Sequence, residues 1–222
     1  MTSRSGFFSS SVGKKYLMGV TGAGLSLFVL AHMLGNMLLF VSPEAYNLYG
    51  HTLIHSKFIY FFEAGLIVLF LLHIIYGVTL TLQNRAARGY RTYLTTSGDK
   101  AVTFSSKTMI WTGTIVGVFT IIHLLNFKFG AYYEIVYDGV TVRDLQRLML
   151  ELFMSPWYVA WYVFAMLTML FHLWHGVQSA FQSLGFRHPR YTPGIIKFGA
   201  VFAWIVGLGF MSQPLYVYFF LN

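Results

Sequence analysis

Five long runs of apolar residues, separated by shorter polar segments, dominate the pattern of this chain. A helix needs about 20 such residues to cross ~30 Å of hydrocarbon, and each run is close to that length or longer. The pattern predicts an all-α integral membrane protein, a single domain over residues 1–222 with five transmembrane helices. The expected helices cover about residues 16–41, 58–82, 109–127, 157–181 and 195–221.

One polar segment has a pattern of its own. Between Arg143 and Phe153, apolar residues recur at the i, i+3, i+4 and i+7 positions of a helix, which predicts a short amphipathic helix. This helix would lie on the outer membrane surface or, as we favour, form a cap on the bundle. No internal repeat, low-complexity tract or second domain is evident.

Composition agrees with a membrane protein. Hydrophobic residues make up 56% of the chain and charged residues 10%, against about 25% charged in an ordinary soluble domain. This balance excludes a disordered chain, a nucleic-acid-binding domain and a soluble enzyme. The chain has no cysteine, which excludes disulfides, zinc–thiolate sites and iron–sulfur ligation within it.

The charges of the polar segments predict the orientation. One side of the expected bundle carries 11 of the 15 basic residues and a single acid, whereas the other side is mixed. By the positive-inside rule the basic side is cytoplasmic. We expect a multi-pass protein of a bacterial cytoplasmic (inner) membrane, with its N-terminus inside and its C-terminus outside.

Five histidines lie within the expected spans, where ionisable residues are costly and usually functional. A single buried histidine is also explained by a hydrogen bond to a neighbouring helix. At 1.5 Å per residue, however, these histidines fall into two layers ~10–13 Å apart. The outer layer holds His32 and His123, and the inner layer holds His73 with His175 or His172.

Diagonal helices of a four-helix bundle would then present two imidazoles in each layer, which suits bis-histidine ligation of two haems by the first four helices. We favour His175 over His172 as the inner ligand because Gly176 leaves room beside it. Copper or zinc is a weaker alternative, since each pair offers only two imidazoles.

The chain resembles the cytochrome b membrane-anchor subunit of complex-II-type succinate:quinone oxidoreductases, in the five-helix, two-haem form. The likeness covers four segments in order. They are residues 10–15 and 21–22 leading into His32-Met33-Leu34-Gly35-Asn36, then Ser42-Pro43-Glu44-Ala45-Tyr46-Asn47, then Glu63, His73, Gly77 and Asn84-Arg85-Ala86-Ala87-Arg88-Gly89, and finally residues 175–185, from His175-Gly176-Val177-Gln178 to Gly185.

The resemblance implies two b-type haems bound by His32, His73, His123 and His175. It also implies a flavoprotein subunit with FAD and an iron–sulfur subunit on the cytoplasmic face, both serving succinate dehydrogenase or fumarate reductase activity. Electrons would pass to or from a membrane quinone, with menaquinone favoured. Some relatives carry a glutamate where this chain has Leu173, which puts a proton relay through that carboxylate in doubt.

Two further groups of residues are candidates. Basic residues on the inner side could pair with haem propionates or dock the iron–sulfur subunit: Lys14, Lys15, Arg85, Arg88, Arg187 and Arg190. Polar residues near the start of the second helix could form an outer quinone site: His51, His55, Lys57 and Glu63.

Two alternatives stay open. One is the two-haem cytochrome b anchor of a hydrogenase or formate dehydrogenase, although no helix here has the two ligands about 13–14 residues apart that such relatives place on one helix. The other is a non-redox transporter with intramembrane histidines, which would favour broken helices, inverted repeats and acidic pairs.

Overall fold

The computed structural model describes residue 6, residues 10–88 and residues 104–221. Its helices are α1 (Ser11–Asn36), α2 (Pro43–Ile54), α3 (Ile59–Arg88), α4 (Phe104–His123), α5 (Leu145–Phe153), α6 (Pro156–Ser183) and α7 (Thr192–Phe220). A 3-10 turn, η2 (Met37–Phe40), follows α1, and a π-helical turn, η4 (Leu124–Lys128), follows α4. The strands β1 (Glu134–Tyr137) and β2 (Val140–Arg143) pair antiparallel.

In the described part of the chain, five helices are long and apolar enough to cross a membrane, which agrees with the predicted number. They are α1 with η2, most of α3, α4 with η4, α6, and α7. Their ends lie within a few residues of the predicted ones. α1 starts at Ser11 because the Ser10 hydroxyl accepts the Gly13 N–H at 3.0 Å, an N-terminal cap on the polar side of the apolar run.

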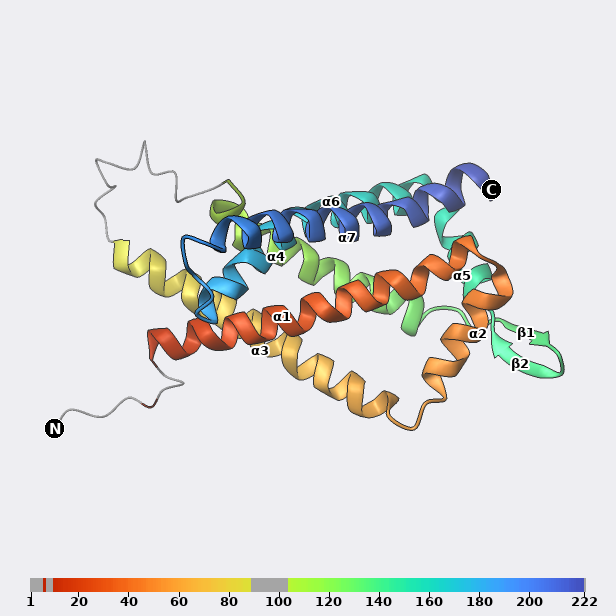
Figure 1. Cartoon of the computed structure of the whole chain (residues 1–222). Coiled ribbons are helices and arrows are strands. Elements are labelled where there is room, and N and C mark those ends of the chain that lie inside the picture. Colours follow the sequence, from red (N-terminus) through yellow and green to blue (C-terminus); the bar gives the residue numbers. More distant parts are fainter. Residues whose placement is uncertain (1–5, 7–9, 89–103, 222) are drawn as a thin grey trace.

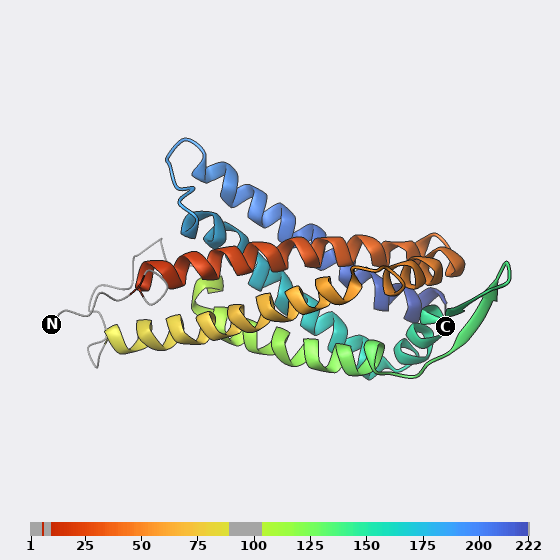
Figure 2. The same ribbon diagram turned by 90° about the horizontal axis from the view of Figure 1, so that it is seen from below.

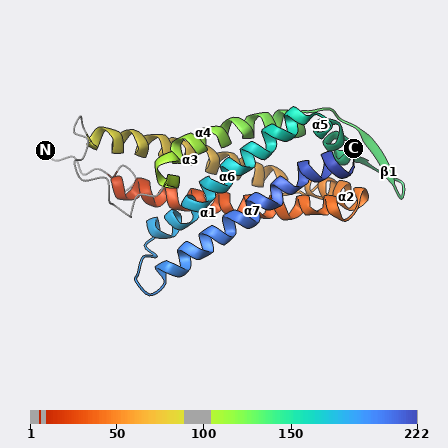
Figure 3. The ribbon, with the colours of Figure 1, turned by 90° about the horizontal axis from the view of Figure 1, so that it is seen from above.

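Four of these helices form an up-down-up-down bundle (Figures 1 and 2). α1 packs against α3 and α6, and α4 packs against α6, whereas α3 and α4 barely touch. α1 is therefore diagonal to α4, and α3 is diagonal to α6, as the sequence pattern predicts. α7 lies along α6 and crosses the bundle obliquely (Figure 3).

The best-packed part of the protein is the α6–α7 side. Leu170, Ala203 and Val206 are fully buried there, and Gly207 lets α7 approach the Leu170 side chain closely. α3 is the opposite extreme, since none of its most apolar stretch is buried within the protein. The bundle is thus closed along α1, α6 and α7 and open along α3.

One end of the bundle carries α2, α5 and the β-hairpin, and we call it the hairpin end (Figure 1). α5 confirms the predicted amphipathic helix, with Leu148, Met149 and Phe153 buried against the bundle. α2 and the hairpin were not predicted. The hairpin turns through Asp138 and Gly139, both with positive φ, the Asp-Gly pair that two-residue turns favour.

The opposite end holds the start of α1, the end of α3 and the α6–α7 connection, and we call it the amino-terminal end. The end of α7 lies at the hairpin end (Figure 1). The start of α1 and the end of α7 are therefore at opposite ends of the bundle, as an odd number of long helices requires.

Candidate functional site: two histidine pairs

The first histidine pair joins the diagonal helices α1 and α4. The ring centroids of His32 and His123 are 5.9 Å apart, and the ring planes are nearly perpendicular, at 80°. Each ring stacks on a phenylalanine one helical turn earlier, Phe28 beneath His32 and Phe119 beneath His123. The sequence-based pairing of His32 with His123 agrees with this geometry.

Two polar groups touch this first pair. The Tyr162 hydroxyl lies 3.5 Å from His123 Nδ1 and accepts a hydrogen bond from Asn126. The Asn36 amide lies 3.3 Å from His32 Nε2, so a metal bound at that nitrogen would replace the Asn36 contact.

The second pair joins the other diagonal, α3 and α6. The ring centroids of His73 and His172 are 6.2 Å apart, with the planes at 70°. His172 rather than His175 therefore faces His73. His175 lies one turn nearer the amino-terminal end, and its buried Nδ1 has no hydrogen-bond partner among the described residues. The reason given for favouring His175, the room beside Gly176, does not distinguish the two, because Gly176 is one turn from His172 as well.

Each histidine of the second pair rests on a Thr-Gly dipeptide of its neighbouring helix. His73 Nδ1 lies 3.3 Å from the Thr21 hydroxyl, and a Cβ on Gly22 would come within 3.3 Å of the His73 ring. On the other side, His172 Nδ1 lies 3.1 Å from the Thr112 hydroxyl, and a Cβ on Gly113 would come within 3.2 Å of the His172 ring.

These contacts measure the separation of the two pairs. On α1, Thr21 marks the level of His73, and His32 follows 11 residues later. On α4, Thr112 marks the level of His172, and His123 also follows 11 residues later. At 1.5 Å per residue both helices place the pairs ~16 Å apart along the bundle. This is wider than the ~10–13 Å expected from depth alone.

The equal spacing exposes an internal repeat that the sequence analysis missed. α1 and α4 share the pattern Thr-Gly-x5-Phe-x3-His, from Thr21 to His32 and from Thr112 to His123. α3 and α6 share His-x3-Gly-Val-x4-Gln, from His73 to Gln83 and from His172 to Gln182. In this alignment His172, not His175, corresponds to His73. The two halves match at few positions within apolar sequence, so the repeat is hard to recognise. The contacts of Thr21 with His73 and of Thr112 with His172 establish its alignment.

The donor set matches a haem better than a bare metal ion. Among the described residues no group of three or more histidine or acidic side chains could hold a metal ion, and a structural zinc needs four ligands. A haem iron already has four porphyrin nitrogens and takes only two axial ligands. An imidazole nitrogen lies ~2 Å from its metal, so two rings on opposite faces of one iron have centroids about 6 Å apart.

Two glycines on the helices that carry the histidines have free space beside them. A Cβ added at Gly117 of α4 or Gly176 of α6 would meet nothing within 4 Å. Gly35 has another role, since it admits the Tyr49 ring against α1.

The predicted basic residues gather at the amino-terminal end. Lys14 is half-buried, and Lys15, Arg85, Arg187 and Arg190 are exposed. The Arg88 side chain lies outside what the structure describes. No ion pair involving the five described residues is found within the described ranges.

The four predicted quinone residues divide into separate groups at the hairpin end. His51 and His55 stack on each other at 3.9 Å. Glu63 instead forms an ion pair with Lys128, which ties the start of α3 to η4. Lys57 is exposed between them. The sequence analysis missed Lys128, because its partner lies 65 residues away.

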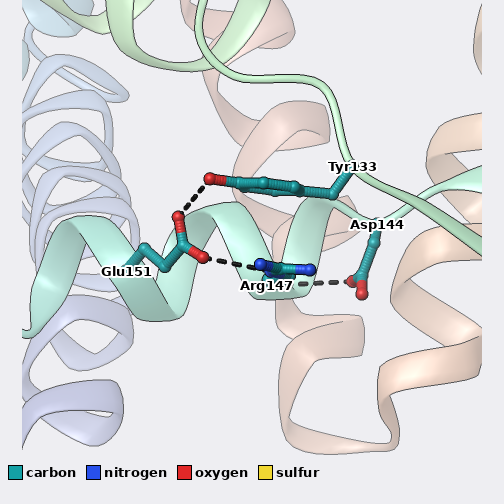
Figure 4. Close-up of polar contacts among 4 residues, drawn as sticks. All are labelled: Tyr133, Asp144, Arg147 and Glu151. Carbon is teal, nitrogen blue, oxygen red and sulfur yellow. Dashed lines mark hydrogen bonds and ion pairs between the residues drawn. The ribbon is translucent and has the colours of Figure 1, made fainter.

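Two polar networks brace the hairpin end. Asn47 is fully buried and joins α2 to the hairpin and α5, through bonds to Tyr137, Asp144 and the Gln146 N–H. On the surface, Tyr133 and Arg147 both bind Glu151, and Asp144 accepts the Arg147 N–H (Figure 4). The hydrogen bond from Tyr133, followed by the one from Arg147, holds the pKa of Glu151 below its ordinary value.

A shallow, open apolar hollow of about 330 Å³ lies between α4 and α6 near the hairpin end. It is lined by Ile122, Trp157, Tyr158 and Trp161. None of the four paired histidines lines it, so it is not the space that the pairs would require.

Comparisons of the chain with family models, with curated proteins and with solved structures find no match.

Proposed function

We propose that this chain is a membrane-bound cytochrome b with two haems, the membrane-anchor subunit of a complex-II-type succinate:quinone oxidoreductase. The observation that carries the proposal is the pair of histidine contacts at 5.9 and 6.2 Å, one on each diagonal of an apolar four-helix bundle. Four histidines, each in a different helix, form two pairs at the ring separation that bis-histidine ligation needs. The resemblance noted in the sequence supports the anchor role.

Two haems supply one-electron carriers that link one membrane face to the other. His32 and His123 would hold the haem nearer the hairpin end, and His73 and His172 the one nearer the amino-terminal end. His172 replaces His175 in this assignment because of its ring contact with His73 and its place in the repeat.

His175 has a different role in this proposal. Its Nδ1 is buried and has no hydrogen-bond partner in the described part of the chain, one turn from His172 toward the amino-terminal end. A donor there suits a haem propionate, which needs a hydrogen-bonding or cationic partner near the polar boundary. Lys14, Arg85 and Arg187 are at the same end of the bundle and could share that task.

The basic amino-terminal end is the proposed cytoplasmic face. An iron–sulfur subunit would dock there, together with a flavoprotein subunit that carries FAD and the dicarboxylate site. The hairpin end would face the outside of a bacterial inner membrane, and the quinone, with menaquinone favoured, would react near the His32–His123 haem.

Within the quinone proposal, the structure favours Glu63 over His51 and His55. Glu63 and Lys128 bridge the ends of α3 and α4, the two helices that flank the open side of the bundle. His55 Nδ1 is 2.9 Å from the carbonyl of His51 in its own helix. A carboxylate paired with an ammonium group can exchange protons with water, which quinone chemistry requires.

The test is to purify the chain with its native partners, quantify haem and record the reduced-minus-oxidised spectrum. Two b-type haems per chain, co-purifying flavin and iron–sulfur subunits, and succinate-dependent quinone reduction are expected. Two haems with hydrogenase or formate dehydrogenase partners would replace the proposal with another respiratory anchor. A colourless protein without such partners would favour the transporter.

A further inference from the structure

The Thr21 and Thr112 hydroxyls each contact a histidine ring nitrogen and also a backbone carbonyl of their own helix. Thr21 Oγ lies 2.8 Å from the Leu17 carbonyl and 3.2 Å from the Met18 carbonyl. Thr112 Oγ lies 3.2 Å from the Thr108 carbonyl and 3.1 Å from the Met109 carbonyl. A serine or threonine inside a helix commonly makes this bond to the preceding turn.

The bond to the preceding turn fixes the direction of the second contact. A hydroxyl has one proton and two acceptor lone pairs, and a carbonyl oxygen can only accept. The threonine proton is therefore donated to the helix carbonyls, and the threonine oxygen is left to accept. The group within reach of that oxygen is Nδ1 of His73 or His172, which would then carry the proton.

We propose that Thr21 and Thr112 are positioning residues that hold His73 and His172 in the tautomer protonated at Nδ1, which leaves the lone pair of Nε2 free for iron. This inference rests on the proposed haem function. A neutral imidazole has one N–H and one lone pair, so fixing one nitrogen as the donor fixes the other as the ligand. No hydrogen bond to Nε2 of either histidine is found within the described ranges.

The glycine after each threonine lets the imidazole reach its hydroxyl. A Cβ at Gly22 or Gly113 would lie 3.3 or 3.2 Å from the Cε1 atom of the histidine, closer than ordinary van der Waals contact. A residue with a Cβ there would require the ring to move by a few tenths of an ångström. In each Thr-Gly dipeptide, the threonine thus fixes which ring nitrogen carries the proton, and the glycine fixes the distance between the histidine ring and the helix.

The same unit occurs twice, once in each half of the repeat. Thr21-Gly22 on α1 serves His73 of α3, and Thr112-Gly113 on α4 serves His172 of α6. The first pair has no such support, because His123 meets Tyr162 and His32 meets Asn36. Substitution of either threonine should therefore affect the His73–His172 haem and leave the His32–His123 haem unchanged.

The first experiment gives its deciding result in the haem-free protein. The full chain is labelled with ¹⁵N-histidine, and the haem-free and haem-loaded forms are compared by solid-state NMR, with signals assigned from His73→Ala and His172→Ala. Both residues should show protonated Nδ1 and unprotonated Nε2 in the haem-free protein, although free histidine prefers the other tautomer. Protonated Nε2 at either residue overturns the proposal there. A protein that never binds haem refutes the proposed function and still yields the tautomers.

The second experiment uses Thr21→Val and Thr112→Val, which keep the shape and remove the acceptor. Groups that hydrogen-bond a metal-ligating histidine typically change metal affinity about 10- to 100-fold when removed. Each valine variant should weaken binding of the His73–His172 haem by at least about 10-fold and raise its midpoint potential, because the imidazole donates less strongly to ferric iron. Thr21→Ser and Thr112→Ser should restore both properties.

Matched controls are available on the same helices. Among the described residues, the Thr114 and Ser26 hydroxyls bond only to carbonyls of their own helices, those of Ile110 and Gly22. Thr114→Val and Ser26→Ala should leave both haems unchanged. The His32–His123 haem reports folding in every variant. Unchanged affinity and potential in both valine variants overturn the proposal. If the valine variants do not fold, the tautomers of the unsubstituted chain decide it.

Discussion

His172 and His175 share one helix face, and only one of them faces His73. The distinction matters because removing a ligand and removing a propionate partner have different effects on the haem. His172→Ala should remove the His73–His172 haem, whereas His175→Ala should retain it with a changed potential. Haem quantitation by the pyridine haemochrome method, with a redox titration of each variant, measures both. Two haems in His172→Ala and one in His175→Ala would return the ligand role to His175.

Sequence reasoning selected His32, His73 and His123 as candidate ligands because each is the single histidine of its span. It could not choose between His172 and His175, since depth and neighbouring glycines describe both equally well. The two differ because His172 contacts α3 and α4. Which histidine makes this contact depends on how α6 is rotated about its own axis. The His-x3-Gly-Val-x4-Gln repeat of α3 and α6 contained this information, but only the contacts of Thr21 and Thr112 with His73 and His172 show why these histidines matter.

The close approach at Gly113 gives a second residue-scale prediction. Gly113→Ala would place a methyl group 3.2 Å from His172 Cε1. We expect the ring to shift away from α4 and the affinity for the His73–His172 haem to fall about 10-fold or more. Gly117→Ala is the matched control, because a Cβ there meets nothing within 4 Å. Haem dissociation rates compare the two, and equal rates would show that His172 tolerates the shift.

At the scale of elements, the hairpin end depends on Asn47. The fully buried Asn47 amide donates to Tyr137 and Asp144 and accepts the Gln146 N–H at 3.0 Å, and these three partner residues are half-buried. Asn47→Ala removes these hydrogen bonds, each of which contributes about 0.5–1.5 kcal/mol. We expect faster hydrogen exchange in α5 and the hairpin and little change in α6. Asn84→Ala, at an exposed site on α3, should have no such effect.

The Tyr133–Arg147–Glu151 network makes the same end sensitive to pH. The pKa of Glu151 is lowered in the folded protein. Its ionised carboxylate therefore stabilises the fold above the ordinary glutamate pKa of about 4.3, and this stabilisation is lost as pH falls through the lowered value. The pKa of Tyr133 is raised, chiefly by its hydrogen bond to Glu151. That contribution is complete below the ordinary tyrosine pKa of about 10 and is lost as pH rises through the raised value.

Hydrogen exchange of α5 amides, corrected for intrinsic rates, should therefore show greatest protection at intermediate pH. Glu151→Gln should flatten the acidic limb. If the loss of protection at acidic pH is equally large in that variant, it arises from other carboxylates.

Sequence patterns predicted helices better than the elements that join them. The five spans and α5 follow from apolar periodicity, which burial or lipid enforces directly. α2 and the hairpin have mixed patterns, and their positions depend on contacts such as Asn47 with Asp144, 97 residues apart. The Asp138-Gly139 turn between short alternating segments was a usable local signal for the hairpin.

For the whole molecule, the absence of cysteine makes orientation easy to measure. Thr141→Cys lies in the exposed hairpin, and Pro189→Cys lies in the exposed connection between α6 and α7. An impermeant thiol reagent applied to intact cells should label Thr141→Cys alone, and inverted vesicles should expose Pro189→Cys alone. The reverse pattern would invert the proposed orientation, and labelling of both from one side would contradict five crossings.

The repeat that links α1 and α3 to α4 and α6 has an evolutionary consequence. Each half contributes one histidine to each pair, so neither half holds a complete pair by itself. Both halves run through the bundle in the same direction, as parallel repeats do when duplication follows an even number of crossings. A two-helix ancestor of this kind would have formed complete histidine pairs only by associating with a copy of itself. His175, with Tyr76 in the matching position of the other half, is one place where the two halves differ.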